Sequence, residues 1–282
     1  MDLPAIQRLS GGRLHLSHGP IDVVLRVWGE APAVAAAEAA AVALFPTILP
    51  GLAAELPELR RPMAEAPRVS HPVARRMLAA CAPFAPLFLT PMAAVAGAVA
   101  DALLAEMLAA APLSRAYVND GGDIAVFVAE GETLSIGLVA EPSRLAVDGA
   151  VAVTPASGIG GVATSGRHGR SFSLGIADAV TVLARDAATA DAAATLIANA
   201  VDLDSPAVRR APAVSLDPDS DLGERPVTVA VGALSPAEIG TALEAGLARA
   251  EAFARAGHIL GAALRLAGEV RTTGLARLAQ RP

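Results

Sequence analysis

The 282-residue chain contains no lysine, so all 22 of its basic residues are arginine. This absence excludes mechanisms that need a lysine side chain, such as Schiff-base chemistry, a pyridoxal-phosphate anchor or the phosphate-binding lysine of a Walker motif. The chain also has a single cysteine, Cys81, so it cannot form a disulfide within itself. Because the surrounding segment MLAACAPF is apolar, we expect Cys81 to pack as a small buried hydrophobe rather than to react as a thiol.

Aromatic residues are also scarce, at 3% of the chain, and the formal net charge is −6. A chain with few stacking side chains and no block of basic residues is not expected to bind nucleic acid. The N-terminal segment MDLPAIQRLS has no basic-then-apolar run, so the sequence predicts a cytoplasmic protein without a secretory signal. Residues 91–111 form the most apolar window, but they include Asp101 and Glu106, which favours a buried helix over a membrane span.

Hydrophobic residues make up 54% of the chain, enough for a sizeable core. The segment RLHLSHGPIDVVLRVWG predicts a β-hairpin that turns at His18, Gly19 and Pro20. Five prolines between residues 45 and 67 predict that any helices there are short. The segment HPVARRMLAACA predicts a helix, and Thr90 and Pro91 predict the N-cap and first position of a long one.

The hydrophobic period then changes to that of strands. The segment RAYVNDGGDIAVFVAEGETLSIGLV predicts three strands, and residues 158–199 predict two more strands and a helix. Residues 202–226 are predicted to form a loop, VTVAV a strand, and residues 235–278 a helical segment that opens with a capping box. Because strands and helices alternate without a long linker, we predict one α/β (α+β) domain over residues 1–282, with a mixed sheet and interleaved helices.

Three segments carry polar side chains suited to binding. The first, NDGGD at residues 119–123, joins two strands, and its paired glycines allow the backbone to approach a ligand closely. Asn119, Asp120 and Asp123 could bind or cap, although the same residue types are ordinary in hairpin turns.

The second segment, GGVATSGRHGRS at residues 160–171, combines four glycines with hydroxyl and basic side chains. Arginines can pair with phosphate oxygens through two hydrogen bonds, so the segment suits a phosphate group. A flexible solvated loop, with His168 as a surface histidine, is the alternative.

The third segment is TADAAAT, in which Asp191 and Thr195 are four residues apart and therefore lie on one face of a helix. A carboxylate and a hydroxyl at this spacing offer two hard oxygen ligands for Mg²⁺. The alternative is an N-capping aspartate followed by a helical threonine without a metal role.

Together these segments resemble the ApbE-like superfamily, whose best-known members are magnesium-dependent FAD:protein FMN transferases. The resemblance is closer to an uncharacterised cytoplasmic branch, and it is carried by four ordered motifs: PMAAVAGA, GGDI, the TSG to ADA segment, and ADAAAT. These motifs lie within a core of about residues 72–201.

The resemblance implies that Asp191 and Thr195 bind Mg²⁺, with a backbone carbonyl near Val95 as a further ligand. It also implies that the two loops line a pocket for FAD or another nucleotide. With the arginines suggested by their chemistry, the expected binding residues are Asn119, Gly121, Gly122, Asp123, Thr164, Ser165, Gly166, Arg167 and Arg170.

The sequence departs from the transferases at two places. It has Ala96 and Gly97 where they carry a lysine–glycine pair, and it lacks their histidine-containing insert. Transfer of FMN to a hydroxyl needs a group that accepts the hydroxyl proton. The candidates are His168, Asp123 and Asp178, and the sequence does not choose among them.

Two functions therefore stand as hypotheses. One is a magnesium-dependent, flavin-processing enzyme of the ApbE-like type. The other is a non-transferase binding protein for a different small metabolite or a pterin. A small-molecule partner is expected in both cases, without a nucleic-acid or membrane partner, and the alanine-rich helices could bury their faces within the chain or in a homo-oligomer.

Overall fold

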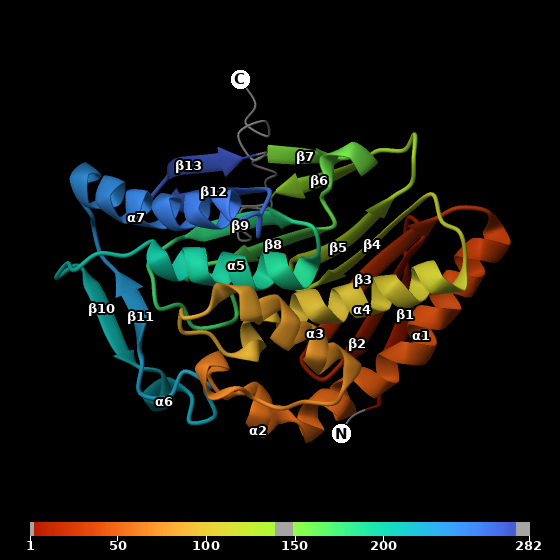
Figure 1. The fold of residues 1–282 in the computed structure, drawn as a ribbon, viewed down its shortest axis with the longest axis horizontal. Coiled ribbons are helices and arrows are strands. Elements are labelled where there is room, and N and C mark those ends of the chain that lie inside the picture. The colour runs from red at the N-terminus through yellow and green to blue at the C-terminus, as the bar shows by residue number, and fades with distance from the viewer. Residues whose placement is uncertain (1–2, 139–148, 275–282) are drawn as a thin grey trace. The chain divides into compact units, whose positions relative to one another are not determined.

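The computed structural model describes residues 3–138 and 149–274, in which helices and strands alternate (Figure 1). The predicted α/β (α+β) fold class is therefore confirmed. The chain divides into two compact units. The first comprises Met1–Ser135, Ala152–Ala163 and Ala184–Ala192, and the second comprises Ile136–Val151, Thr164–Leu183 and Ala193–Pro282. The single-domain organisation stays a prediction.

An antiparallel meander forms the sheet of the first unit. Its strands are β1 (Ala5–Leu9), β2 (Arg13–His18), β3 (Ile21–Trp28), β4 (Arg115–Asp120) and β5 (Asp123–Val128). The predicted hairpin is confirmed, because β2 and β3 pair with His18 opposite Ile21. The strand β8 (Gly161–Ser165) lies next to β5, with Val162 opposite Ile124.

Three helices form the core of the first unit together with this sheet (Figure 1). They are α1 (Ala31–Ala54), α3 (Pro72–Cys81) and α4 (Val95–Ala110). Phe45, Met77 and Leu103 from these helices are fully buried. The helix α4 packs against β4, β5 and α1, so its apolar sequence is explained by a position in the core.

The prediction of short helices between residues 45 and 67 is wrong for α1, which continues through Pro46 and Pro50. Each proline removes one backbone donor from the helix. The two lie one turn apart, and Pro50 is exposed, so water can reach the freed backbone carbonyls on that side. Only α2 (Leu56–Leu59), which follows, is short.

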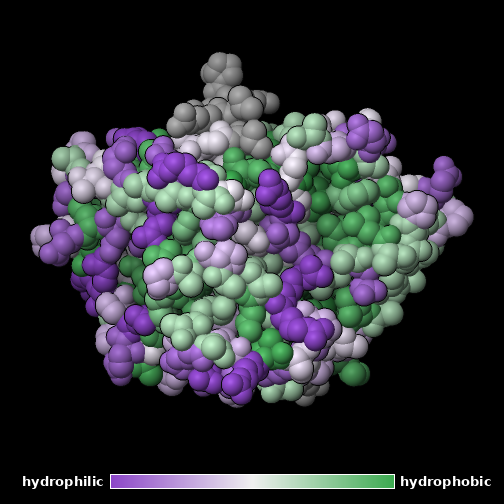
Figure 2. Space-filling view, viewed as in Figure 1, coloured by the Kyte–Doolittle hydropathy of each residue, from purple (hydrophilic) through white to green (hydrophobic). Residues whose placement is uncertain are grey.

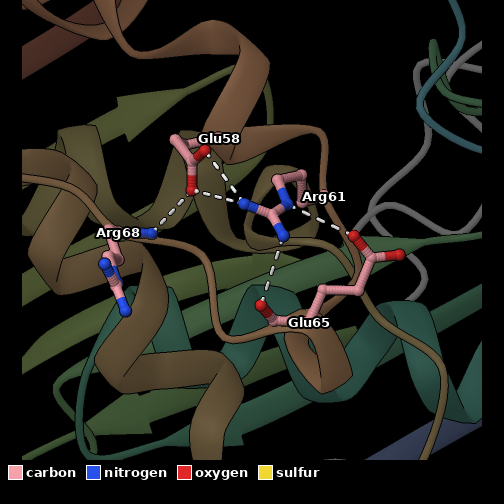
Figure 3. Close-up of polar contacts among 4 residues, drawn as sticks. All are labelled: Glu58, Arg61, Glu65 and Arg68. Carbon is pink, nitrogen blue, oxygen red and sulfur yellow. Dashed lines mark hydrogen bonds and ion pairs between the residues drawn. The ribbon is translucent and has the colours of Figure 1, made fainter.

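Polar contacts hold the segment that joins α2 to α3. Arg61 donates to Glu58 and Glu65, and the backbone N–H of Arg68 donates to Glu58 (Figure 3). These side chains lie at the surface, so their ion pairs contribute little to stability. Figure 2 shows hydrophobic residues exposed among hydrophilic ones on the face viewed, as expected of a chain this rich in apolar residues.

Trp28, the only tryptophan of the chain, lies at the end of β3. The guanidinium carbons of Arg26 and Arg115 lie 4.4 and 5.0 Å from its ring centroid, and the ring of Tyr117 lies 6.0 Å away. These three neighbours of the indole all belong to the first unit.

The second unit contains a sheet in which β12 (Gly261–Leu266) pairs with both β9 (Ala179–Ala184) and β13 (Glu269–Gly274). The helix α7 (Pro236–Arg255) packs on β12 and β13 (Figure 1). Ser235 caps this helix in the predicted capping box with Glu238. The predicted helical segment 235–278 is wrong beyond Arg255, because a β-hairpin follows. Residues 275–278 lie outside the described residues.

The predicted loop at residues 202–226 is also wrong in part. It contains β10 (Val208–Pro212) and α6 (Ala213–Leu216), and β10 pairs with β11 (Pro226–Val231). Charged side chains at Arg209 and Arg210 and a register shift between them obscure the alternation that identifies a strand. The strands β6 (Leu134–Leu138) and β7 (Gly149–Val153) form a separate two-stranded sheet.

Two described helices are long and apolar enough to cross a membrane, Ala31–Ala54 and Pro91–Ala110. Length and composition alone do not distinguish such helices from core helices. More than half of the apolar window in Pro91–Ala110 is buried inside the protein, in agreement with the predicted buried helix. Thr90 occupies the predicted N-cap position, but its side chain makes no capping hydrogen bond, and the segment opens with a 3₁₀ turn at Pro91–Ala94.

Candidate functional site

Asp191 lies on α5 (Ala187–Ala200) and is held by the N-terminus of α4. The backbone N–H of Gly97 donates to Asp191 Oδ2 at 3.1 Å. The structure therefore brings Asp191 to the segment around Val95, where the family resemblance implies a further metal ligand. The alternative that Asp191 caps its own helix is wrong, because Asp186 does so by accepting from the Thr189 N–H at 2.7 Å.

The environment of Asp191 disfavours its negative charge. Burial raises the pKa of Asp191 well above its ordinary value, and the carboxylates of Asp123 and Asp120 raise it further. The backbone N–H groups of Gly97 and Ala96 oppose this shift. A divalent cation beside these three carboxylates would offset their mutual repulsion, so the local charge suits a metal ion.

The available ligand atoms suit Mg²⁺ better than a softer metal. Thr195 is half-buried one helical turn after Asp191, so the helix presents a carboxylate and a hydroxyl on one face. Among the described residues, no group of three or more His, Cys, Asp or Glu side chains is arranged to hold a metal ion. Mg²⁺ commonly retains several water ligands and needs few protein side chains. The metal role of Asp191 and Thr195 stays a prediction.

The NDGGD segment forms the tight turn between β4 and β5. Gly121 and Gly122 have φ values of +64° and +118°, which favour glycine, and Asn119 Oδ1 accepts from the Gly122 N–H at 2.8 Å. Asp120 and Asp123 lie opposite each other in the pairing. The turn thus uses the side chain of Asn119, while Asp123 contributes charge beside Asp191.

The glycine loop after β8 belongs mostly to the second unit and is organised by Asp178. Arg167 donates to Asp178 Oδ1 from Nε at 2.9 Å and from Nη2 at 2.6 Å. The Ala267 N–H donates to the other carboxylate oxygen at 2.6 Å. A Cβ on Gly166 would lie 2.6 Å from the Asp178 carbonyl oxygen, so the loop passes too close to the Asp178 backbone for any residue other than glycine. Arg167 was expected to bind phosphate. In the structure the edge of its guanidinium formed by Nε and Nη2 is already paired with Asp178.

His168 and Asp178, two of the three candidate proton acceptors, are neighbours. His168 Nε2 lies 3.3 Å from Asp178 Oδ1, and the imidazole is 49% exposed. The third candidate, Asp123, lies in the hairpin turn of the first unit. Of the remaining predicted binding residues, Thr164 has its hydroxyl 2.9 Å from that of Thr181, Ser165 ends β8, and Arg170 is exposed.

Cys81 is buried, with its sulfur 3.7 Å from the carbonyl oxygen of Thr90. Burial, and to a lesser extent the charge of Asp191, raises the pKa of its thiol. A buried thiol that resists ionisation is a poor nucleophile. The prediction of a small buried hydrophobe is confirmed.

Sequence reasoning missed the role of Asp101 on α4. Its carboxylate accepts from the Ala187 N–H at 3.0 Å and from the Ala188 N–H at 2.9 Å, at the N-terminus of α5. Burial raises the pKa of Asp101 to about 6, although these two hydrogen bonds lower it. The sequence feature that could have identified this role is a charged residue inside an apolar helix, because a buried carboxylate needs polar partners.

We expect Asp101 to make the stability of the protein depend on pH. Its pKa of about 6 in the folded state lies above the ordinary aspartate value of 3.8, so its contribution to stability is complete below about pH 4 and is lost as the pH rises through 6. Two pKa units correspond to about 3 kcal/mol. Urea denaturation at a series of pH values should show the wild type losing about this much between pH 4 and 7 relative to Asp101→Asn. Parallel pH profiles for the two proteins would contradict this expectation.

Comparison with known proteins gives consistent matches. The family model described as "AbpE bacteria" matches residues 6–272. The chain is 42% identical over 120 residues to a UPF0280 protein of Methanothrix thermoacetophila, covering 42% of this chain and 48% of the relative. It is 41% identical over 100 residues to a UPF0280 protein of Archaeoglobus fulgidus, covering 36% of this chain and 39% of that relative. The matches span about half or less of these curated relatives. Since the family model covers most of the chain, this protein belongs to the AbpE bacteria family of ApbE-like proteins.

Proposed function

We propose that this protein binds FAD or a related nucleotide together with Mg²⁺, and that it acts as a flavin-processing enzyme of the FAD:protein FMN transferase type. The observation that supports this most directly is the carboxylate of Asp191, anchored by the Gly97 N–H and surrounded by the charges of Asp123 and Asp120. Buried carboxylates that raise one another's pKa are typical of functional sites.

In this proposal Asp191 and Thr195 would hold the metal ion, and the chemistry it would supply is positive charge near the phosphate oxygens. In the transfer step the hydroxyl oxygen of the acceptor would form a bond to the FMN phosphorus as the pyrophosphate bond of FAD breaks and AMP leaves. His168 would accept the proton of that hydroxyl group. Its Nε2 faces the Asp178 carboxylate, which leaves Nδ1 as the nitrogen that can accept a proton. Through this contact Asp178 orients the ring, as carboxylates do for catalytic histidines.

Isothermal titration of the purified protein with FAD tests the proposal. We expect micromolar binding in the presence of Mg²⁺ and binding at least about tenfold weaker in the presence of a chelator. Such a result would justify a flavinylation assay with candidate acceptor proteins. Equal affinity with and without Mg²⁺ would argue against the metal assignment, and absent binding would argue against FAD.

A second candidate is a non-transferase binding protein for another small metabolite or a pterin. Two observations favour it: Ala96 and Gly97 replace the lysine–glycine pair of the transferases, and Asp178 already occupies one edge of Arg167. Mass spectrometry of the ligand that co-purifies with the protein separates the two candidates. Recovery of FAD would count against the second.

A further inference from the structure

The N-terminus of each of the helices α4 and α5 receives an aspartate from the other helix. Asp191 of α5 accepts from the Gly97 N–H of α4, and Asp101 of α4 accepts from the Ala187 and Ala188 N–H groups of α5. Gly97 and Asp101 are one turn apart on α4, and Ala187 and Asp191 are one turn apart on α5. We call this set of three hydrogen bonds the reciprocal cap. It lies within the first unit.

The reciprocal cap and Asp186 together leave no open N–H group among the first four amides of α5. Ala187 and Ala188 donate to Asp101, Thr189 donates to the Asp186 side chain, and Ala190 donates to the Asp186 carbonyl at 3.2 Å. Helix N-termini bind phosphate through such amides. Since these are satisfied by protein groups, Asp101 serves the placement of α5 and not the direct binding of an anion.

The two helices approach each other closely at this point. A Cβ on Gly97 would lie 2.3 Å from the carbonyl oxygen of Ala187, and Asp101 is only 8% exposed. With no side chain between the backbones, the hydrogen bonds of Asp101 determine where the first turn of α5 lies. The carboxylate of Asp191 is one turn further along the same rigid helix, so a shift of that first turn displaces it from Gly97.

We propose that Asp101 is a positioning residue for the Asp191 site: by holding the first turn of α5 it fixes the Asp191 carboxylate against the N-terminus of α4. Its role in metal binding rests on the function proposed above, whereas the placement of the Asp191 carboxylate does not. Residues that orient metal ligands typically change metal affinity by about 10-fold to 100-fold when they are replaced.

The test uses Asp101→Asn, which keeps the side-chain volume but presents an amide donor to one of the two N–H groups. We expect this variant to bind Mg²⁺ at least about tenfold more weakly in isothermal titration. We also expect hydrogen exchange at the Gly97 amide to accelerate at least about tenfold, because its bond to Asp191 is weakened. Both measurements are made well below the unfolding temperature, where the variant is folded.

Leu243→Ala is the control, because Leu243 is fully buried on α7 in the second unit. It lowers stability by cavity formation and should leave Mg²⁺ affinity and exchange at Gly97 unchanged. If Asp101→Asn shows native exchange at Gly97, the proposal is wrong, and native Mg²⁺ affinity would also overturn it. If the wild type binds no Mg²⁺, the proposed function fails, while exchange at Gly97 still decides whether Asp101 places Asp191.

Discussion

Replacing Asp191 by asparagine is expected to abolish the enhancement of FAD binding by Mg²⁺. The amide keeps an oxygen that can accept from Gly97, but it removes the charge that a divalent cation requires. Titration of the variant with FAD should give the same affinity with Mg²⁺ and with a chelator. A persistent Mg²⁺ effect of wild-type size would show that Asp191 is not the metal ligand.

The same substitution is expected to make the metal-free protein more stable. It removes a carboxylate whose charge is disfavoured by burial and by Asp123 and Asp120. Glu106→Gln is the matched control, because Glu106 is exposed on α4 and the change removes one charge without touching this cluster. The control should alter neither FAD affinity nor stability appreciably. If Asp191→Asn loses the response to Mg²⁺ and gains stability, the carboxylate of Asp191 serves function at the expense of stability. A carboxylate with a structural role would lower stability when replaced.

Gly97→Ala is expected to destabilise the protein by about 3 kcal/mol or more. The new methyl group would lie 2.3 Å from the Ala187 carbonyl oxygen and 2.7 Å from the Ala188 nitrogen. Both atoms belong to the backbone of α5, so they can yield only if the two helices separate. Urea denaturation of the variant measures the loss.

Gly240→Ala provides the opposite result from the same chemical change. Gly240 lies inside α7, and a Cβ there meets nothing within 4 Å. Alanine favours a helix over glycine by about 0.5–1 kcal/mol, so this variant should be more stable than the wild type. If Gly97→Ala were as stable as Gly240→Ala, the close approach of α4 and α5 would be refuted.

Where local patterns agree with tertiary packing, the sequence was sufficient to predict the elements. The hairpin around Gly19, the NDGGD turn and the helix that begins after Ser235 were all predicted from turn or capping residues. These signals act through neighbouring backbone groups, so they hold in almost any tertiary context.

The errors arose where tertiary contacts override local preference. Prolines did not end α1, because its buried face, which includes Phe45 and Ile48, packs in the core while Pro50 lies at the surface. The strand β13 was missed because its sequence, EVRTTG, is polar and largely exposed, and its stability depends on pairing with β12. Propensity is a weak guide at such positions.

In the candidate site, the four-residue spacing to Thr195 identified Asp191, but it did not identify the backbone N–H group that holds the Asp191 carboxylate. The contact with Gly97 joins residues 94 positions apart, and Asp101 meets Ala187 across 86 positions. No local pattern encodes such pairs. Likewise, His168 and Asp178 were separate candidates in the sequence, and the folding of the glycine loop onto Asp178 made them neighbours.

The position of Trp28 gives the protein a built-in optical probe. Its indole lies among Arg26, Arg115 and Tyr117, which all belong to the first unit, and the chain has no other tryptophan. Tryptophan fluorescence during unfolding therefore reports on the first unit, whereas far-ultraviolet circular dichroism reports on helices and strands throughout the chain. Coincident transitions by the two signals would indicate that both units unfold in one cooperative step, and separate transitions would give each unit its own stability.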